Sequence, residues 1–89
     1  MFYKVKSVLP QADLKLLIQF VDGTTKEYDV APLLDKWPVF QALKITPELF
    51  DCVKVDAGGY GISWNDDVDL SCDELWEIGK QVSAPFTNI

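Results

Sequence analysis

Residues 14–30 read LKLLIQFVDGTTKEYDV, and this stretch decides the fold. Its first half carries a large apolar residue at every second position, which is the period of a half-buried β-strand. The pair Asp22-Gly23 follows, and this pair is typical of a tight hairpin turn. The second half is again typical of a strand, so we expect two antiparallel strands joined by a short loop.

The register of this hairpin follows from which residues must share a face. A loop of two residues would set Ile18 opposite Glu27, which is a poor core pair. A loop of three residues that ends at Gly23 sets Leu16 opposite Tyr28 and keeps the apolar residues together. We therefore predict the three-residue loop, with Gly23 at a bulge and at a positive φ angle.

Alternation of apolar residues predicts further strands. The first covers residues 3–9, and a turn follows it at residues 10–13. The face that this strand turns to the core comprises Tyr3, Val5, Ser7 and Leu9. Two more strands are expected at residues 53–55 and 60–64, on either side of a glycine-rich turn.

Prolines divide the middle of the chain into short helical turns. Pro32 and Pro47 stand where proline is favoured, in the first turn of a helix. Trp37-Pro38 changes the direction of the chain between them. The apolar residues of these turns are Val39, Phe40, Leu43, Leu49 and Phe50, and we expect the last two to fill the core.

The C-terminal helix has the clearest start signal. Ser71 and Glu74 form the capping box S-x-x-E, in which each side chain satisfies a backbone N–H group at the helix start. Gly79 is placed to end the helix. The apolar face of this helix comprises Cys72, Leu75 and Ile78.

These elements predict an α+β domain with a small, mostly antiparallel sheet of about five strands, short central helices and a C-terminal helix. We expect a single domain over residues 1–82 and a loose C-terminal tail over residues 83–89. The two cysteines, Cys52 and Cys72, are too few for a disulfide framework, and we expect buried free thiols.

The charge of −6 is unevenly spread along the 89 residues. Residues 1–54 contain seven lysines and seven acidic residues, whereas residues 55–89 contain one lysine and seven acidic residues. An acidic chain without arginine repels a polyanion, so we expect neither direct nucleic-acid binding nor binding to an anionic membrane. No apolar run approaches the length of a membrane span and the N-terminus lacks a signal-peptide pattern, so a cytoplasmic location is expected.

Three segments together suggest a relationship: LLIQFVDG at residues 16–23, YDVAPLL at 28–34 and GISWNDDVDLS at 61–71. In their order and spacing they resemble the family catalogued as domain of unknown function 2442, over roughly residues 3–80. The resemblance implies a small α+β module without established catalytic activity. Some members of that family carry a helix-turn-helix domain after it, and others stand alone beside small toxin-like proteins, which implies a partner-binding or antitoxin role.

Catalytic chemistry finds little support in the residue types. The chain has no histidine, so the commonest general base near neutral pH is absent and no Ser-His or Cys-His pair can form. We interpret Asp66, Asp67 and Asp69 as a solvated loop, because acidic loop residues rarely form an active site unless other polar groups converge on them. A calcium loop of the EF-hand type would need glycine in place of Cys72 and glutamate in place of Ile78. We therefore predict no enzymatic activity, no metal site and no cofactor.

The acidic C-terminal third, with its tryptophans, is the candidate partner-binding surface. Trp64 is expected to pack under the last helix and Trp76 beside the apolar face of that helix. Carboxylates around them would attract a lysine- or arginine-rich protein. The predicted partner-binding residues are Trp64, Asp66, Asp67, Asp69, Asp73, Trp76 and Glu77.

The predicted function is thus a non-catalytic protein-binding module, an antitoxin-like partner of a basic protein. Two alternatives remain open. The first is a homodimeric structural or regulatory domain of a transcription-related system, which associates through sheet edges. The second is a carboxylate-based enzyme that uses Asp66, Asp67 and Asp69.

Overall fold

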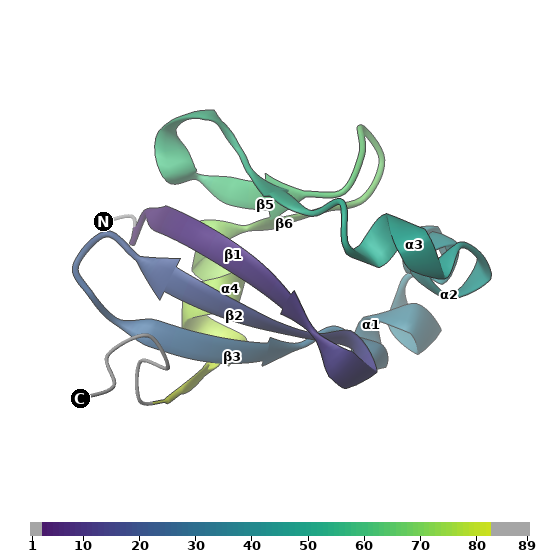
Figure 1. The fold of residues 1–89 in the computed structure, drawn as a ribbon, viewed down its shortest axis with the longest axis horizontal. Coiled ribbons are helices and arrows are strands. Elements are labelled where there is room, and N and C mark those ends of the chain that lie inside the picture. The colour runs from purple at the N-terminus through teal and green to yellow at the C-terminus, as the bar shows by residue number, and fades with distance from the viewer. Residues whose placement is uncertain (1–2, 83–89) are drawn as a thin grey trace.

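The computed structural model describes residues 3–82, and the predicted C-terminal tail at 83–89 lies outside the described residues (Figure 1). The strands are β1 (Val5–Gln11), β2 (Lys15–Phe20), β3 (Thr25–Asp29), β4 (Lys54–Val55), β5 (Gly61–Ser63), β6 (Asp69–Ser71) and β7 (Lys80–Gln81). The α-helices are α1 (Ala31–Lys36), α2 (Ala42–Ile45), α3 (Pro47–Phe50) and α4 (Cys72–Ile78). Three short 3₁₀ helices connect them, namely η1 (Ala12–Leu14), η2 (Pro38–Gln41) and η3 (Ala57–Gly59).

The described strands form two antiparallel sheets, one of four strands in the order β1-β2-β3-β7 and one of three in the order β4-β5-β6. The predicted α+β class is confirmed. The strands are divided between two sheets and number more than the five or so expected, and the two that were not expected, β6 and β7, are only three and two residues long. Strands this short, directly flanking a helix, leave no alternation in the sequence from which to predict them.

The predicted hairpin register is confirmed between β2 and β3. Leu16 lies opposite Tyr28, and the N–H of Phe20 donates to the carbonyl of Thr24 at 2.8 Å, which closes the three-residue loop. Gly23 adopts a φ angle of 95°. The loop length therefore places the apolar residues of both strands on the inner face of the sheet.

The first strand differs from its prediction. A bulge between Val5 and Ser7 shifts the alternation, so Val5 and Val8 turn to the core while Leu9 is exposed. The strand also continues to Gln11, which takes up the first two of the residues expected to form a turn. The extra residue of a bulge reverses which face the following side chains occupy, and this accounts for the misplaced Leu9.

The core lies between the inner face of the four-stranded sheet and α4, which crosses behind that sheet (Figure 1). Leu16, Ile18 and Phe20 of β2 are completely or almost completely buried there. Leu75 of α4 and Ile62 of β5 complete the same cluster. The two sheets and α4 therefore share one hydrophobic core.

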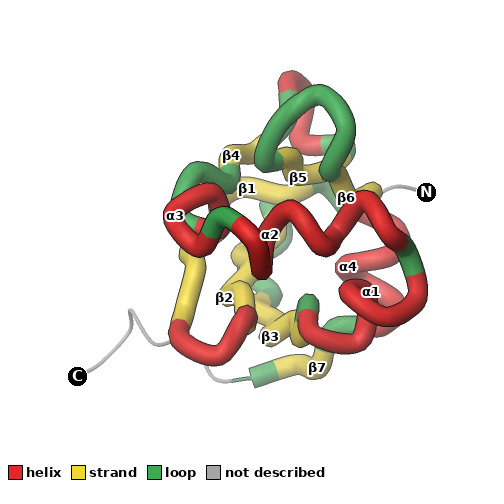
Figure 2. The backbone as a smooth tube through the Cα atoms, turned by 90° about the vertical axis from the view of Figure 1, so that its right-hand side faces the viewer, coloured by secondary structure: helices red, strands yellow, loops and turns green. Residues whose placement is uncertain are grey.

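The central helices gather at one end of the molecule, as Figure 2 shows from the side. Phe40, Leu43 and Phe50 are buried, and Leu49 packs against the core from its edge. Helices of four to six residues have little stability of their own, so these anchors hold them in place. None of the helices within residues 3–82 has both the length and the apolar composition needed to cross a membrane.

The two cysteines are free, but only one matches its prediction. Cys72 is buried at the start of α4, whereas Cys52 is exposed. Burial and the neighbouring carboxylate of Asp73 raise the pKa of the Cys72 thiol. Cys52 lies in the turn that follows α3, between the buried Phe50 and the partly buried Val53, and its own side chain is exposed.

Replacing Gly23 with alanine should lower the free energy of unfolding by about 1 kcal/mol, because alanine resists a positive φ angle. The added Cβ would meet no atom within 4 Å, so the cost should come from the backbone alone. Urea denaturation of the wild type, Gly23→Ala and Gly23→Asn measures it, and asparagine should cost less because it tolerates this conformation better. A neutral Gly23→Ala variant would contradict the assigned loop.

Candidate functional site: a groove between the central helices and β6

The junction of β6 and α4 is fixed by the helix cap. The N–H of Glu74 donates to the Ser71 hydroxyl oxygen at 3.2 Å, so the predicted serine cap is confirmed. The side chain of Glu74 is used differently from the capping box, because it accepts a hydrogen bond from the Tyr28 hydroxyl at 2.7 Å. One carboxylate thus links the first turn of α4 to β3.

Buried behind this carboxylate, Tyr28 is only 2% exposed. Burial raises the pKa of the Tyr28 hydroxyl, and the hydrogen bond to Glu74 raises this pKa further. Tyr28 therefore acts as a neutral donor that orients Glu74.

The loop before β6 is held by a side chain that the sequence analysis did not single out. The Asn65 side-chain oxygen accepts from the backbone N–H groups of Asp67 and Val68, each at 2.9 Å. The N–H of Trp64 donates to the carbonyl of Val68 at 2.9 Å and closes the loop. This compact turn leaves the Asp66 and Asp67 side chains exposed.

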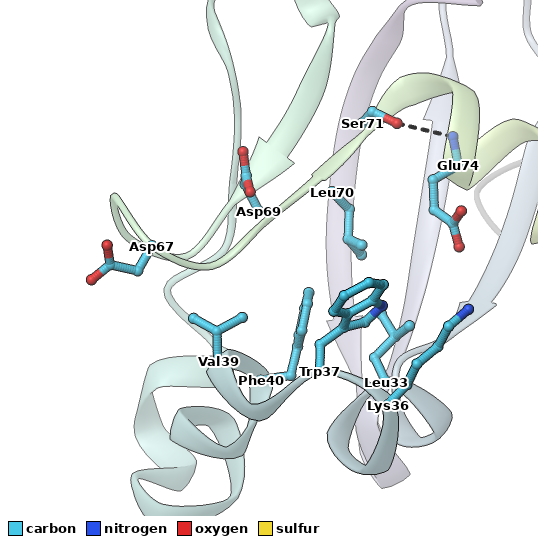
Figure 3. Close-up of a pocket in the computed structure, with 10 residues that line it drawn as sticks. All are labelled: Leu33, Lys36, Trp37, Val39, Phe40, Asp67, Asp69, Leu70, Ser71 and Glu74. Atoms are coloured by element: carbon cyan, nitrogen blue, oxygen red, sulfur yellow. Dashed lines mark hydrogen bonds between the residues drawn. The ribbon is translucent and has the colours of Figure 1, made fainter.

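A groove of about 370 Å³ separates this loop and β6 from α1 and η2 (Figure 3). Its lining combines an apolar wall with acidic side chains. The apolar wall comprises Leu33, Trp37, Val39, Phe40 and Leu70. The polar lining residues are Lys36, Asp67, Asp69, Ser71 and Glu74.

Two apolar side chains of this wall are open to solvent. Trp37 is 53% exposed and Val39 is 41% exposed. Lys36, which also lines the groove, places its ammonium group 5.8 Å from the centre of the Trp37 ring. The groove lining contains three carboxyl groups and one lysine, so the groove carries a net negative charge.

The structure divides the predicted site residues into three groups. Asp67 and Asp69 line the groove. Asp66, Asp73 and Glu77 are exposed but are not part of its lining. The two tryptophans have structural positions, described next.

The inclusion of Trp64 in the partner-binding surface was wrong. Its side chain is 5% exposed and contacts the rings of Phe40 and Phe50, at centroid distances of 6.0 and 6.1 Å. Its indole N–H donates to the carbonyl of Phe50 at 3.1 Å. Trp64 thus anchors the central helices.

Trp76 is half-buried and its ring is already covered on both sides. Tyr3 stacks on it at 3.7 Å between ring centroids, Phe20 meets it edge-on, and the Lys26 ammonium lies 4.1 Å from its centre. Lys26 also donates to the backbone carbonyl of Trp76. These contacts make Trp76 a fastening point between α4 and the four-stranded sheet.

The apolar wall of the groove was not predicted from the sequence. Val39 was expected only as part of a helical turn, and Trp37 only as part of a break in the chain. The available signal was the pair Trp37-Pro38, since a rigid break between two very short helices leaves a large ring without a helix face to bury. Among residues 3–82, no group of three or more histidine, cysteine, aspartate or glutamate side chains is placed to hold a metal ion.

The fold and the groove together define a small α+β domain with an open, acidic and partly aromatic surface groove. The chain belongs to the family described as "Protein of unknown function (DUF2442)", whose model matches residues 5–81. No curated protein and no solved structure matches the chain. The matched range includes all the residues that line the groove.

Replacing Tyr28 with phenylalanine should cost about 1–2 kcal/mol of unfolding free energy near neutral pH, because the Glu74 carboxylate loses a buried donor. The raised pKa adds a pH dependence. Only the unfolded state releases the proton near pH 10, the ordinary tyrosine value, so this stabilisation is complete below about pH 10 and is lost as pH rises further.

Denaturation between pH 7 and pH 11 tests both effects. The fall in stability above about pH 10 should be shallower in Tyr28→Phe than in the wild type. Tyr60→Phe, at a half-exposed position, controls for the loss of a tyrosine hydroxyl. Identical pH profiles for the wild type and Tyr28→Phe would show that Tyr28 has no such role.

Proposed function

We propose that this protein is a non-catalytic binding module that holds a basic segment of a partner protein in the groove between β6 and the central helices. The observation that carries the proposal is the exposed pair Trp37 and Val39, which lies in an open groove whose other side is formed by the loop and strand that carry Asp67 and Asp69 (Figure 3). The biological role that we propose for this binding is neutralisation of a basic, toxin-like protein.

The two walls of the groove support two kinds of contact. A tryptophan that is half exposed at the surface is a typical centre of binding energy, because its ring buries a large area at little entropic cost. The carboxylates favour lysine or arginine and repel acidic segments. A segment that carries both an apolar and a cationic side chain can pack against the apolar wall and pair with the carboxylates.

The groove is held in shape without a partner. Tyr28 fixes Glu74, Asn65 fixes the loop that carries Asp67, and Trp64 ties the central helices to β5. Pre-organisation of this kind reduces the entropy lost on binding. This rigidity supports a binding role for the surface.

Variants of the groove provide the test, with a tagged protein used for capture from cells of the source organism and quantitative mass spectrometry. Trp37→Ala should weaken retention of a basic partner by at least about 10-fold, since a central tryptophan contributes about 2 kcal/mol or more. Asp67→Asn with Asp69→Asn should weaken it by about 3- to 10-fold and reduce its sensitivity to salt.

The matched control is Asp66→Asn with Glu77→Gln, which removes the same charge from exposed positions outside the groove lining. This control should retain the partner almost as well as the wild type. Equal losses for both charge variants would indicate a general effect of net charge and would contradict the groove as the binding site. Retention that is unchanged in Trp37→Ala would contradict it as well.

A further inference from the structure

In the part of the chain that the structure describes, the strand that borders the groove has a neighbouring strand on one side only. Among residues 3–82, β6 pairs with β5 and forms the edge of the three-stranded sheet. An edge strand presents backbone N–H and C=O groups that another strand can pair with. The groove therefore offers backbone groups in addition to side chains.

The groove opens onto this edge and not only onto one face of the strand. Asp69, Leu70 and Ser71 all line it, although successive side chains of a strand point to opposite faces. Figure 3 shows Leu70 directed toward Trp37 and Asp69 directed away from it. A space that is lined by three consecutive residues must run along the edge of the strand.

The hydrogen bonds at the two ends of β6 determine which of its backbone groups point away from β5. The N–H of Trp64 donates to the carbonyl of Val68, and the N–H of Cys72 donates to the carbonyl of Tyr60. Antiparallel pairing alternates, so Leu70 directs its backbone groups to Ile62 of β5. The backbone groups of Asp69 and the N–H of Ser71 consequently point away from β5.

From this geometry we infer that the partner's basic segment binds in an extended conformation, as an antiparallel strand added to β6. The inference rests on the proposed function and specifies its chemistry. Main-chain hydrogen bonds to Asp69 and Ser71 supply affinity, and alternating side chains supply specificity. Partner side chains beside Asp69 are cationic, and those beside Leu70 are apolar and contact Trp37.

A second copy of this chain fits the edge poorly. Pairing of two β6 strands would bring the carboxylates of both copies together, and each chain carries a net charge of −6. Acidic residues on an edge strand oppose association with an identical edge while they admit a cationic strand. The negative charge of this edge therefore favours a basic segment of another protein as the added strand.

A synthetic peptide with the sequence acetyl-KVKVKVK-amide is the probe, titrated into ¹⁵N-labelled protein and followed by NMR. In the proposed register, lysines of the peptide lie opposite Asp69 and Ser71, and a valine lies opposite Leu70. We expect weak binding, with a Kd on the order of 10⁻⁴ M, and shifts centred on the amides of Asp69 and Ser71 and on the Trp37 indole.

Two N-methylated versions of the peptide isolate the backbone contribution. In the antiparallel register, lysine N–H groups face β6 and valine N–H groups face solvent. Methylation of the two central lysine amides should weaken binding at least 10-fold. Methylation of two valine amides should change it less than 3-fold.

The outcomes separate this inference from the proposed function. If both methylated peptides bind as well as the parent, or if valine methylation is the damaging change, antiparallel pairing with β6 is wrong while the groove remains a binding site. If the parent peptide produces no shift in the groove at 1 mM, both the strand pairing and the proposed function are overturned. The double variant Asp67→Asn with Asp69→Asn should weaken binding of the parent peptide in either binding mode.

Discussion

The arrangement of the molecule depends on how α4 is fastened to the four-stranded sheet. Lys26 of β3 places its ammonium over the Trp76 ring and donates to the Trp76 carbonyl, while the Tyr3 ring stacks on the Trp76 ring. A cation over a tryptophan face and a charged donor to a carbonyl each contribute on the order of 1 kcal/mol. In a domain of this size, contacts of that strength are a sizeable part of the total stability.

The groove follows from this fastening, because α4 begins where β6 ends. Ser71 is the last residue of β6 and the N-cap of α4, so the position of the helix determines the position of the strand. Glu74 is held from the other side by Tyr28. With β6 and α4 held in this position, an open groove lies between them and the central helices (Figure 3).

Local rules predicted a large part of the fold and little of the site. The hairpin register and the Ser71 cap depend on neighbouring residues, and both could be derived from spacing. The bulge in β1 could not, because Leu9 continues the alternation of Tyr3 and Val5 in the sequence, which therefore gives no sign of the extra residue. The burial of Trp64 and the groove wall at Trp37 depend on how short helices dock onto distant strands, which no periodicity encodes.

Native-state hydrogen exchange in the wild type and in Lys26→Met tests most directly whether the sheet holds α4 and β6 in place. Methionine keeps an apolar side chain of similar length and removes the charge and the donor. The account predicts that the amides of Cys72 and Gly79 exchange about 10-fold faster in the variant, while the Val30 amide, which donates to Leu14, changes far less. Equal acceleration of all three amides, or no change at Cys72 and Gly79, would contradict it.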